Sequence, residues 1–137
     1  MAIESHIRPE DNLVVLTHVG EIGDDEFLAF YNSFFKSDTF KPSMNILVDL
    51  RKADSSPRSA GVLRRFAEFL QAVRPDITSH TKVAVVAPKD LSFGLARMYE
   101  VLSDSVLWNF AVFRAMDAAL AWLGLREDSV NHETWDA

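Results

Sequence analysis

The chain has 137 residues, 48% of them hydrophobic and 25% charged, which is enough to bury one hydrophobic core and too few for two. Its 14 basic and 20 acidic residues give a formal charge of -6, which argues against general binding to nucleic acid or to anionic membranes, because both would repel it. The absence of cysteine excludes disulfides and thiolate chemistry. No apolar run approaches the ~20 residues that cross a bilayer, and charges near the amino terminus interrupt any signal-peptide core. We therefore expect a soluble, cytoplasmic, single-domain protein with no membrane insertion.

The amino-terminal half alternates strand and helix patterns. Residues 2–8 and 13–19 are rich in β-branched and aliphatic side chains and flank a polar turn, so they predict a β-hairpin. A helix then begins near Asp24 or Asp25, either of which is suited to cap it. Its apolar face is aromatic and consists of Phe27, Phe30, Tyr31, Phe34 and Phe35. Residues 44–50 form a continuous apolar run, which is typical of a strand covered on both faces.

The second half continues the alternation. Residues 61–73 predict a second helix with an apolar stripe of Val62, Leu63, Phe66, Ala67, Leu70 and Val73. Residues 81–87 predict a buried strand, because five of the seven are aliphatic. Residues 91–104 predict a third helix with an inward stripe of Leu91, Leu95, Met98 and Leu102. A last strand at 109–115 and a last helix at 116–124, which a glycine ends, complete the pattern.

This order of elements predicts the fold class. Strands that alternate with helices of this length favour an α/β sandwich with a mostly parallel central sheet and about four helices on its two faces. The amino-terminal hairpin makes the sheet mixed. We expect one domain over residues 1–124, followed by a polar tail at 125–137.

Hydroxyl and acidic side chains precede the second helix. In parallel sheets, ligands and switches lie beyond the carboxyl ends of the strands, which is where these residues fall. Asp54, Ser55 or Ser56 could cap the helix, with Pro57 in its first turn. A phosphate on Ser55 or Ser56 would instead be stabilised by the free N–H groups and positive end of the same helix. A helix cap and a phosphorylation site are both compatible with this segment.

Six further residues are candidates for ligand binding: Asp49, Arg51, Phe93, Gly94, Arg97 and Tyr99. Asp49 ends a buried strand, where it either orients a ligand or pairs locally with Arg51. Arg97 lies on the polar side of the third helix, where it binds an anionic group, pairs with Asp90 or is solvated. Gly94 costs that helix about 1 kcal/mol relative to alanine, which suggests a close approach of backbone or ligand.

The sequence contains no recognisable catalytic set. It has no Gly-x-Ser-x-Gly motif, no glycine-rich phosphate loop and no dinucleotide-binding pattern. The histidines are His6, His18, His80 and His132, and none has the i, i+4 partner that is typical of a metal site. We therefore predict a protein that is not an enzyme and that uses no metal and no cofactor.

Three segments resemble one known family. "MNILVDLR" at 44–51, "KVAVVAPKDLSFGLARMYE" at 82–100 and "FRAMDAALAWLG" at 113–124 are similar to the SpoIIAA-like family of small bacterial proteins, also described as STAS/CRAL-TRIO-like. The resemblance covers about residues 10–124. It implies a STAS-type fold with a four- or five-stranded mixed sheet, helices on both sides and no established enzymatic activity.

The resemblance also implies two kinds of function. In anti-sigma factor antagonists of this fold, a partner kinase phosphorylates a serine at the amino end of the second helix, which Ser55 and Ser56 match, although Pro57 replaces the glycine of that pattern. The lipid-carrying branch implies an apolar cavity, whose wall would include Phe40, Phe66, Phe69 and Phe93, with Arg97 as the partner of an anionic group.

The leading prediction is a non-catalytic domain that acts by protein association, as a homodimer or with a regulatory partner. The alternative is a carrier of a small apolar or lipid-like molecule.

Overall fold

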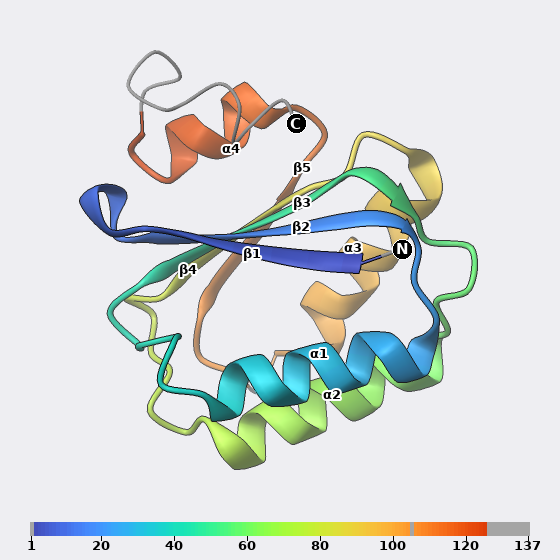
Figure 1. Ribbon diagram of the computed structural model, residues 1–137, viewed down its shortest axis with the longest axis horizontal. Coiled ribbons are helices and arrows are strands. Elements are labelled where there is room, and N and C mark those ends of the chain that lie inside the picture. Colours follow the sequence, from blue (N-terminus) through green and yellow to red (C-terminus); the bar gives the residue numbers. More distant parts are fainter. Residues whose placement is uncertain (1, 105, 126–137) are drawn as a thin grey trace.

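Five strands form one sheet in the order β1-β2-β3-β4-β5 (Figure 1). They are β1 (Ala2–Arg8), β2 (Leu13–Glu21), β3 (Asn45–Asp54), β4 (Lys82–Val86) and β5 (Asn109–Phe113). Strands β2 to β5 run parallel, and β1 is antiparallel to β2. The computed structural model describes residues 2–104 and 106–125, so the predicted tail at 125–137 lies outside the described residues except for Leu125. The predicted mixed, mostly parallel sheet with an amino-terminal hairpin is confirmed.

A tight turn closes the hairpin between β1 and β2. Pro9–Asp11 form one turn of 3-10 helix, and Asn12 follows with a φ of 54°. Asparagine tolerates this left-handed conformation better than most residues do. Its side-chain Nδ2 donates to the Ser43 carbonyl oxygen at 2.6 Å, and its own carbonyl oxygen accepts from the Asn45 amide at 3.0 Å. The turn therefore also fixes where β3 begins.

The α-helices of the described residues cover the sheet unevenly (Figure 1). They are α1 (Asp24–Lys36), α2 (Ala60–Val73), α3 (Asp90–Leu102) and α4 (Met116–Trp122). The strand order advances in one direction from β2 to β5, so right-handed crossovers place α1, α2 and α3 on the same face. Helix α4 follows β5 and packs on β4 and β5 from the opposite face. The predicted helices on both faces are present, with α1, α2 and α3 on one face and α4 on the other.

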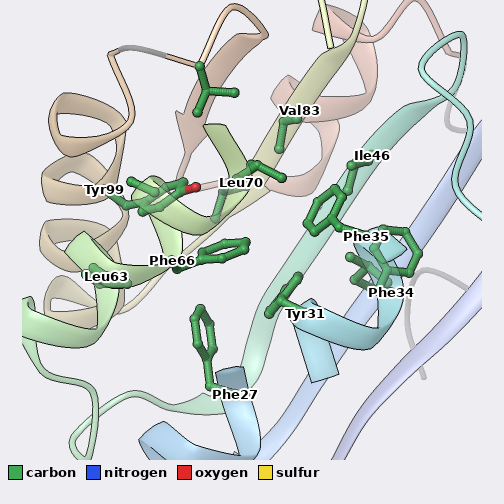
Figure 2. Packing of buried hydrophobic residues seen from close by; sticks show 14 of the residues in the cluster. Phe27, Tyr31, Phe34, Phe35, Ile46, Leu63, Phe66, Leu70, Val83 and Tyr99 are labelled. Atoms are coloured by element: carbon green, nitrogen blue, oxygen red, sulfur yellow. The ribbon is translucent and has the colours of Figure 1, made fainter. Parts of the chain in front are cut away.

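A large hydrophobic cluster lies between the sheet and α1 to α3. Figure 2 shows Phe66 of α2 at its centre, between the aromatic residues of α1 and Tyr99 of α3. The Phe66 ring packs on that of Tyr99 at a centroid distance of 5.3 Å and on that of Phe27 at 5.6 Å. A smaller cluster under α4 contains Leu47 and Leu120. Full burial of a leucine or phenylalanine side chain contributes roughly 1.5–3 kcal/mol to the free energy of unfolding.

Helix α2 begins later than the sequence predicts. Strand β3 continues to Asp54 because it pairs with β2 as far as Glu21. The cap is Ser59, whose hydroxyl oxygen accepts from the Val62 amide at 3.2 Å. The predicted caps Asp54, Ser55 and Ser56 are therefore wrong, and Pro57 lies in the preceding turn rather than in the helix.

Helix α3 presents a different face to the sheet than the predicted stripe. Its buried residues are Ser92, Ala96 and Tyr99, whereas Leu91 and Met98 of the predicted stripe are 52% and 40% exposed. Two of the three inward positions thus carry small side chains. Small residues at a helix contact leave space that larger ones would fill, and this space is part of the site described below.

Helix α4 ends at Trp122, and Gly124 stops it as predicted. The Gly124 amide donates to the Ala121 carbonyl oxygen at 3.0 Å, and the Leu125 amide donates to that of Leu120 at 2.8 Å. This pair of bonds is the Schellman arrangement, which requires a positive φ at the residue after the helix. Gly124 has a φ of 79°, which glycine adopts without strain.

Candidate functional site

A cavity lies between the sheet and helices α1, α2 and α3. Its volume, counted as the space open to the centre of a water molecule, is about 100 Å³. Twenty residues line it, and all except His18, Ser55, Arg58 and Ser92 are apolar or aromatic. Such a wall favours apolar molecules, because water inside it would find few hydrogen-bond partners.

The strand register orients this cavity along the sheet. Ile46 of β3 pairs with Val83 of β4, and Val83 pairs with Phe110 of β5, at the end where these strands begin. Leu50 and Ser55 lie further along β3 and just beyond it. We call the two ends of the cavity the amino end and the carboxyl end, after the strand ends that they adjoin.

Two serine hydroxyls meet at the carboxyl end. The Oγ atoms of Ser55, just after β3, and of Ser92, in the first turn of α3, are 2.7 Å apart. The Nζ of Lys89 donates to the Ala53 carbonyl oxygen at 2.9 Å and ties the same two segments together. These contacts close the space between β3 and α3 with polar groups that already have partners.

Arg58 also lies at the carboxyl end of the cavity, and its guanidinium group contacts several neighbouring residues. Its NH1 donates to Asp24 Oδ1 at 2.9 Å, and its NH2 donates to the Ile22 carbonyl oxygen at 3.1 Å. Its guanidinium carbon lies 4.0 Å from the centre of the Phe27 ring, which is a favourable cation-π distance. Burial alone would raise the pKa of Asp24, but hydrogen bonds from Ser59 and Arg58 outweigh it and lower that pKa overall.

His18 and Tyr31 form a buried polar pair in the wall. The His18 Nε2 and the Tyr31 hydroxyl oxygen are 2.7 Å apart. Burial, assisted by the positive charge of Arg58, lowers the pKa of His18 to about 3. Burial also raises the pKa of Tyr31. Both side chains are therefore neutral near pH 7, so the pair adds hydrogen-bonding capacity without charge.

At the amino end, two buried polar atoms have no hydrogen-bond partner among the described residues. They are the hydroxyl oxygen of Tyr99 and the Nε1 of Trp108, and both side chains line the cavity. Burial and, to a smaller extent, Tyr31 raise the pKa of Tyr99, and the nearby Ser103 hydroxyl, one turn further along α3, opposes this without forming a hydrogen bond of good geometry. An unsatisfied buried polar group costs roughly 1–3 kcal/mol. This end of the site is thus prepared for a hydrogen-bonding partner.

Of the predicted phosphorylation sites, only Ser55 lines the cavity. Ser56 is exposed, and its amide donates to Asp54 Oδ1 at 3.0 Å in the turn before α2. A phosphate on either residue would not lie on the helix cap, because Ser59 occupies that position. Modification of Ser55 and Ser56 stays a prediction.

Asp49 and Arg51 lie on the opposite face of the sheet. Asp49 alternates with Val48, which lines the cavity, so the carboxylate points to the face that α4 covers. The Arg51 Nε and NH2 atoms donate to this carboxylate at 2.9 to 3.2 Å. The predicted local pair is present, and it is separate from the cavity.

The candidates on α3 are dispersed. Tyr99 lines the cavity, whereas Arg97 has a 60% exposed side chain and pairs with Glu100 at 3.3 Å. A Cβ at Gly94 would meet no atom within 4 Å, so the backbone of the described chain does not approach it closely, and the approach of a ligand stays a prediction. Phe93 packs at the edge of the core with the Arg114 guanidinium 4.2 Å from its ring centre. Of the predicted aromatic wall, Phe66 lines the cavity, and Phe40, Phe69 and Phe93 do not.

Sequence reasoning missed most of the polar residues of the site. Arg58 pairs with Asp24, 34 positions earlier in the chain, which leaves no local signal. His18 belongs to no motif, and in the sequence it follows Thr17 at the end of an apolar run. Trp108 lies in the short connection to β5, and a large aromatic residue in such a connection was the available indication that it packs inward.

Neither a metal centre nor a membrane span is found in the part of the chain that the structure describes. Across residues 2–104 and 106–125, no three His, Cys, Asp or Glu side chains gather closely enough to hold a metal ion. No helix within these ranges is long and apolar enough to cross a membrane.

The arrangement of strands and helices matches a solved structure. It is an uncharacterised protein of the DUF3478 family, with a SpoIIAA-like fold, from Shewanella loihica PV-4. The match has a TM-score of 0.51 and 16% sequence identity, and covers 89% of this chain and 92% of the other. The chain has a SpoIIAA-like fold. No protein-family model matches the sequence, and no curated protein matches it significantly. This similarity shows only the fold. The function of this SpoIIAA-like domain must therefore be inferred from the cavity of the chain itself.

Proposed function

We propose that the protein binds a small, mainly apolar molecule in the cavity between the sheet and α1 to α3 and acts as its carrier. The observation that carries this proposal is a mainly apolar cavity wall that also contains buried polar atoms without partners among the described residues. A cavity that results only from imperfect packing is lined by apolar atoms. Binding sites for small molecules combine these two properties.

The local chemistry of the wall supports binding rather than catalysis. His18, with a pKa of about 3, is a poor general base at neutral pH. Its Nε2 is engaged by Tyr31, and the hydroxyls of Ser55 and Ser92 are engaged with each other. The polar groups of the wall thus stabilise its shape.

A cavity-filling variant tests this proposal. Ala96 lines the cavity from α3 and is 9% exposed, so Ala96→Leu should fill part of the space without removing a contact. We expect the wild type to retain or take up a small apolar molecule in native mass spectrometry and the variant to lose it.

The matched control is Ala72→Leu, which makes the same change at an exposed position of α2. Its binding should equal that of the wild type. Equal binding by the wild type and Ala96→Leu would contradict the proposal, as would a wild type that takes up no apolar compound.

A second candidate function is association through the outer face of α3. Leu91, Met98 and Val101 are 52%, 40% and 74% exposed, and Leu107 after the helix is 67% exposed. Leu91 and Met98 are seven residues apart and therefore lie on one side of the helix, with Val101 one turn further. Exposed apolar stripes of this kind mark protein interfaces, and we propose that this one forms a homodimer.

Sedimentation analysis of Val101→Lys tests the homodimer. We expect the wild type to sediment as a dimer and the variant as a monomer, because a charge at the centre of an apolar contact is costly. Gln71→Lys, at an exposed position of α2, is the control for the added charge. A monomeric wild type, or a variant that remains dimeric, would rule out this interface.

A regulatory partner would act through Ser55 or Ser56. Ser56 is exposed in a turn, where a kinase can reach it. Mass spectrometry of protein purified from its native host should then detect phosphate on one of these serines. Its absence under every growth condition would end this proposal.

A further inference from the structure

The amino end of the cavity is a compartment bounded by aromatic rings. The Tyr99 ring lies 6.3 Å from that of Trp108 and 5.5 Å from that of Phe110, and the Trp108 and Phe110 rings are 5.6 Å apart. Phe35 closes this group, with its ring 6.3 Å from Trp108. In Figure 2 the hydroxyl oxygen of Tyr99 points inward from α3, toward the centre of the cluster. Flat aromatic groups pack well against walls of this kind in offset or edge-to-face geometry.

The unpartnered atoms here define what a ligand must offer. The indole Nε1 of Trp108 can only donate a hydrogen bond, and the Tyr99 hydroxyl can donate as well as accept. Tyr99 is 6% exposed, so bulk water does not reach this group readily. A ligand with an oxygen acceptor at its buried end would satisfy the Trp108 donor, and the same oxygen could accept from Tyr99.

The charge distribution of the wall excludes an anionic group at this end. Among the described residues that line the cavity, Arg58 is the only one that carries a charge near pH 7. It lies at the carboxyl end, where Asp24 already compensates it at 2.9 Å. A carboxylate placed beside Trp108 would lose its hydration without gaining a cation, and a neutral acceptor avoids this penalty.

The size of the space suits a single ring. For comparison, an engineered apolar cavity of about 150 Å³ in another protein binds benzene. The present cavity of about 100 Å³ is of the same order. A space of this size holds a single ring.

We infer that the ligand is a neutral, single-ring aromatic molecule with a carbonyl or ether oxygen, which accepts a hydrogen bond from Trp108 Nε1 and lies beside the Tyr99 hydroxyl. This inference rests on the proposed binding function and specifies the chemical class of its ligand.

A matched set of probes tests it on the intact protein. Acetophenone and ethylbenzene have nearly the same shape, but only acetophenone has an oxygen acceptor, and benzoate adds a negative charge. In calorimetric titrations we expect acetophenone to bind about fivefold more tightly than ethylbenzene, which is the net worth of one hydrogen bond. Benzoate should bind more weakly than either. The indole N–H resonance of Trp108 should shift with acetophenone and much less with ethylbenzene.

Variants test whether the preference for acetophenone over ethylbenzene depends on Trp108. Trp108→Phe keeps an aromatic ring and removes the donor, so the ratio of the two affinities should fall toward one. Trp122→Phe makes the same change in α4, on the opposite face of the sheet, and should leave the ratio unchanged. If Trp108→Phe fails to fold, the comparison of probes on the wild type and Tyr99→Phe still decides the question.

The outcomes separate this inference from the function on which it rests. Equal affinity for ethylbenzene and acetophenone would overturn the inference and leave the proposed function intact. Tightest binding of benzoate would also overturn it, in favour of an anion site. No binding of any aromatic or aliphatic probe would overturn both.

Discussion

Arg58 connects three parts of the chain that are distant in sequence. Its guanidinium group binds the Asp24 carboxylate of α1 and the Ile22 carbonyl oxygen while it covers the ring of Phe27. The same positive charge lowers the pKa of His18, after the larger effect of burial. One residue in the loop before α2 therefore organises the polar end of the cavity and adds to the burial that keeps its histidine neutral.

The buried histidine predicts a specific dependence of stability on pH. His18 has a pKa near 6.5 when unfolded and about 3 when folded, so the unfolded state binds more protons between these values. This contribution to stability is complete above pH 6.5 and is lost as the pH falls. We expect a loss of about 2 kcal/mol in the free energy of unfolding between pH 7 and pH 5.

Urea unfolding at the two pH values measures this loss. His18→Gln can still form a hydrogen bond with Tyr31 but does not titrate, so its free energy of unfolding should change less over the same interval. An identical pH dependence in the wild type and the variant would show that His18 is not the group responsible.

The connection from β3 to α2 shows how a cap stabilises an element. Ser59 accepts from the Val62 amide at 3.2 Å and donates to Asp24 Oδ2 at 2.8 Å, so it joins the start of α2 to the first turn of α1. Asp24, in turn, serves Ser59 and Arg58 instead of capping its own helix, which begins after Gly23 without a side-chain cap.

Removal of this cap predicts a measurable cost. Ser59→Ala should lower the free energy of unfolding by about 1 kcal/mol, since the Val62 amide and Asp24 both lose a partner. Ser56→Ala, in the exposed turn three residues earlier, should change it by less than about 0.5 kcal/mol. Chemical unfolding of the two variants compares them, and a larger effect at Ser56 would restore the cap that the sequence predicts.

The sequence predicts elements well where their signals are local. The continuous apolar run at 81–87 needs a covered strand, and β4 is that strand. The segment from Asp54 to Ser59 is different, because it contains several acceptable caps, and the pairing of β3 with β2 decides among them. Helix α3 likewise has apolar residues on more than one side, so packing against β3 and β5 selects its inward face.

The layering of the whole molecule explains why a cavity forms on one face. Three helices must cover one side of a five-stranded sheet, and α3 does so with Ser92 and Ala96 inward. The aromatic residues of α1 and α2 fill most of the remaining volume, and Tyr99 and Trp108 frame what is left. The opposite face, under α4, is packed as a separate small cluster.

Less of the site than of the fold can be predicted from the sequence. The aromatic face of α1 and the position of Ser55 beyond a strand end are readable because they depend on periodicity and on the topology of parallel sheets. The pairing of Ser55 with Ser92, and of Arg58 with Asp24, depends on contacts between distant segments. Gly94 and Arg97 are candidates by residue type alone, and the rotation of α3 places both outside the cavity.

The most direct test of the central claim is a crystal structure of the protein soaked with bromobenzene, a single ring whose bromine atom is located by anomalous scattering. The predicted result is one bromine peak inside the cavity, between α3 and the sheet, which disappears in Ala96→Leu. A cavity that stays empty in the soaked wild type, or that side chains fill completely, would contradict the claim that this SpoIIAA-like domain binds a small apolar molecule there.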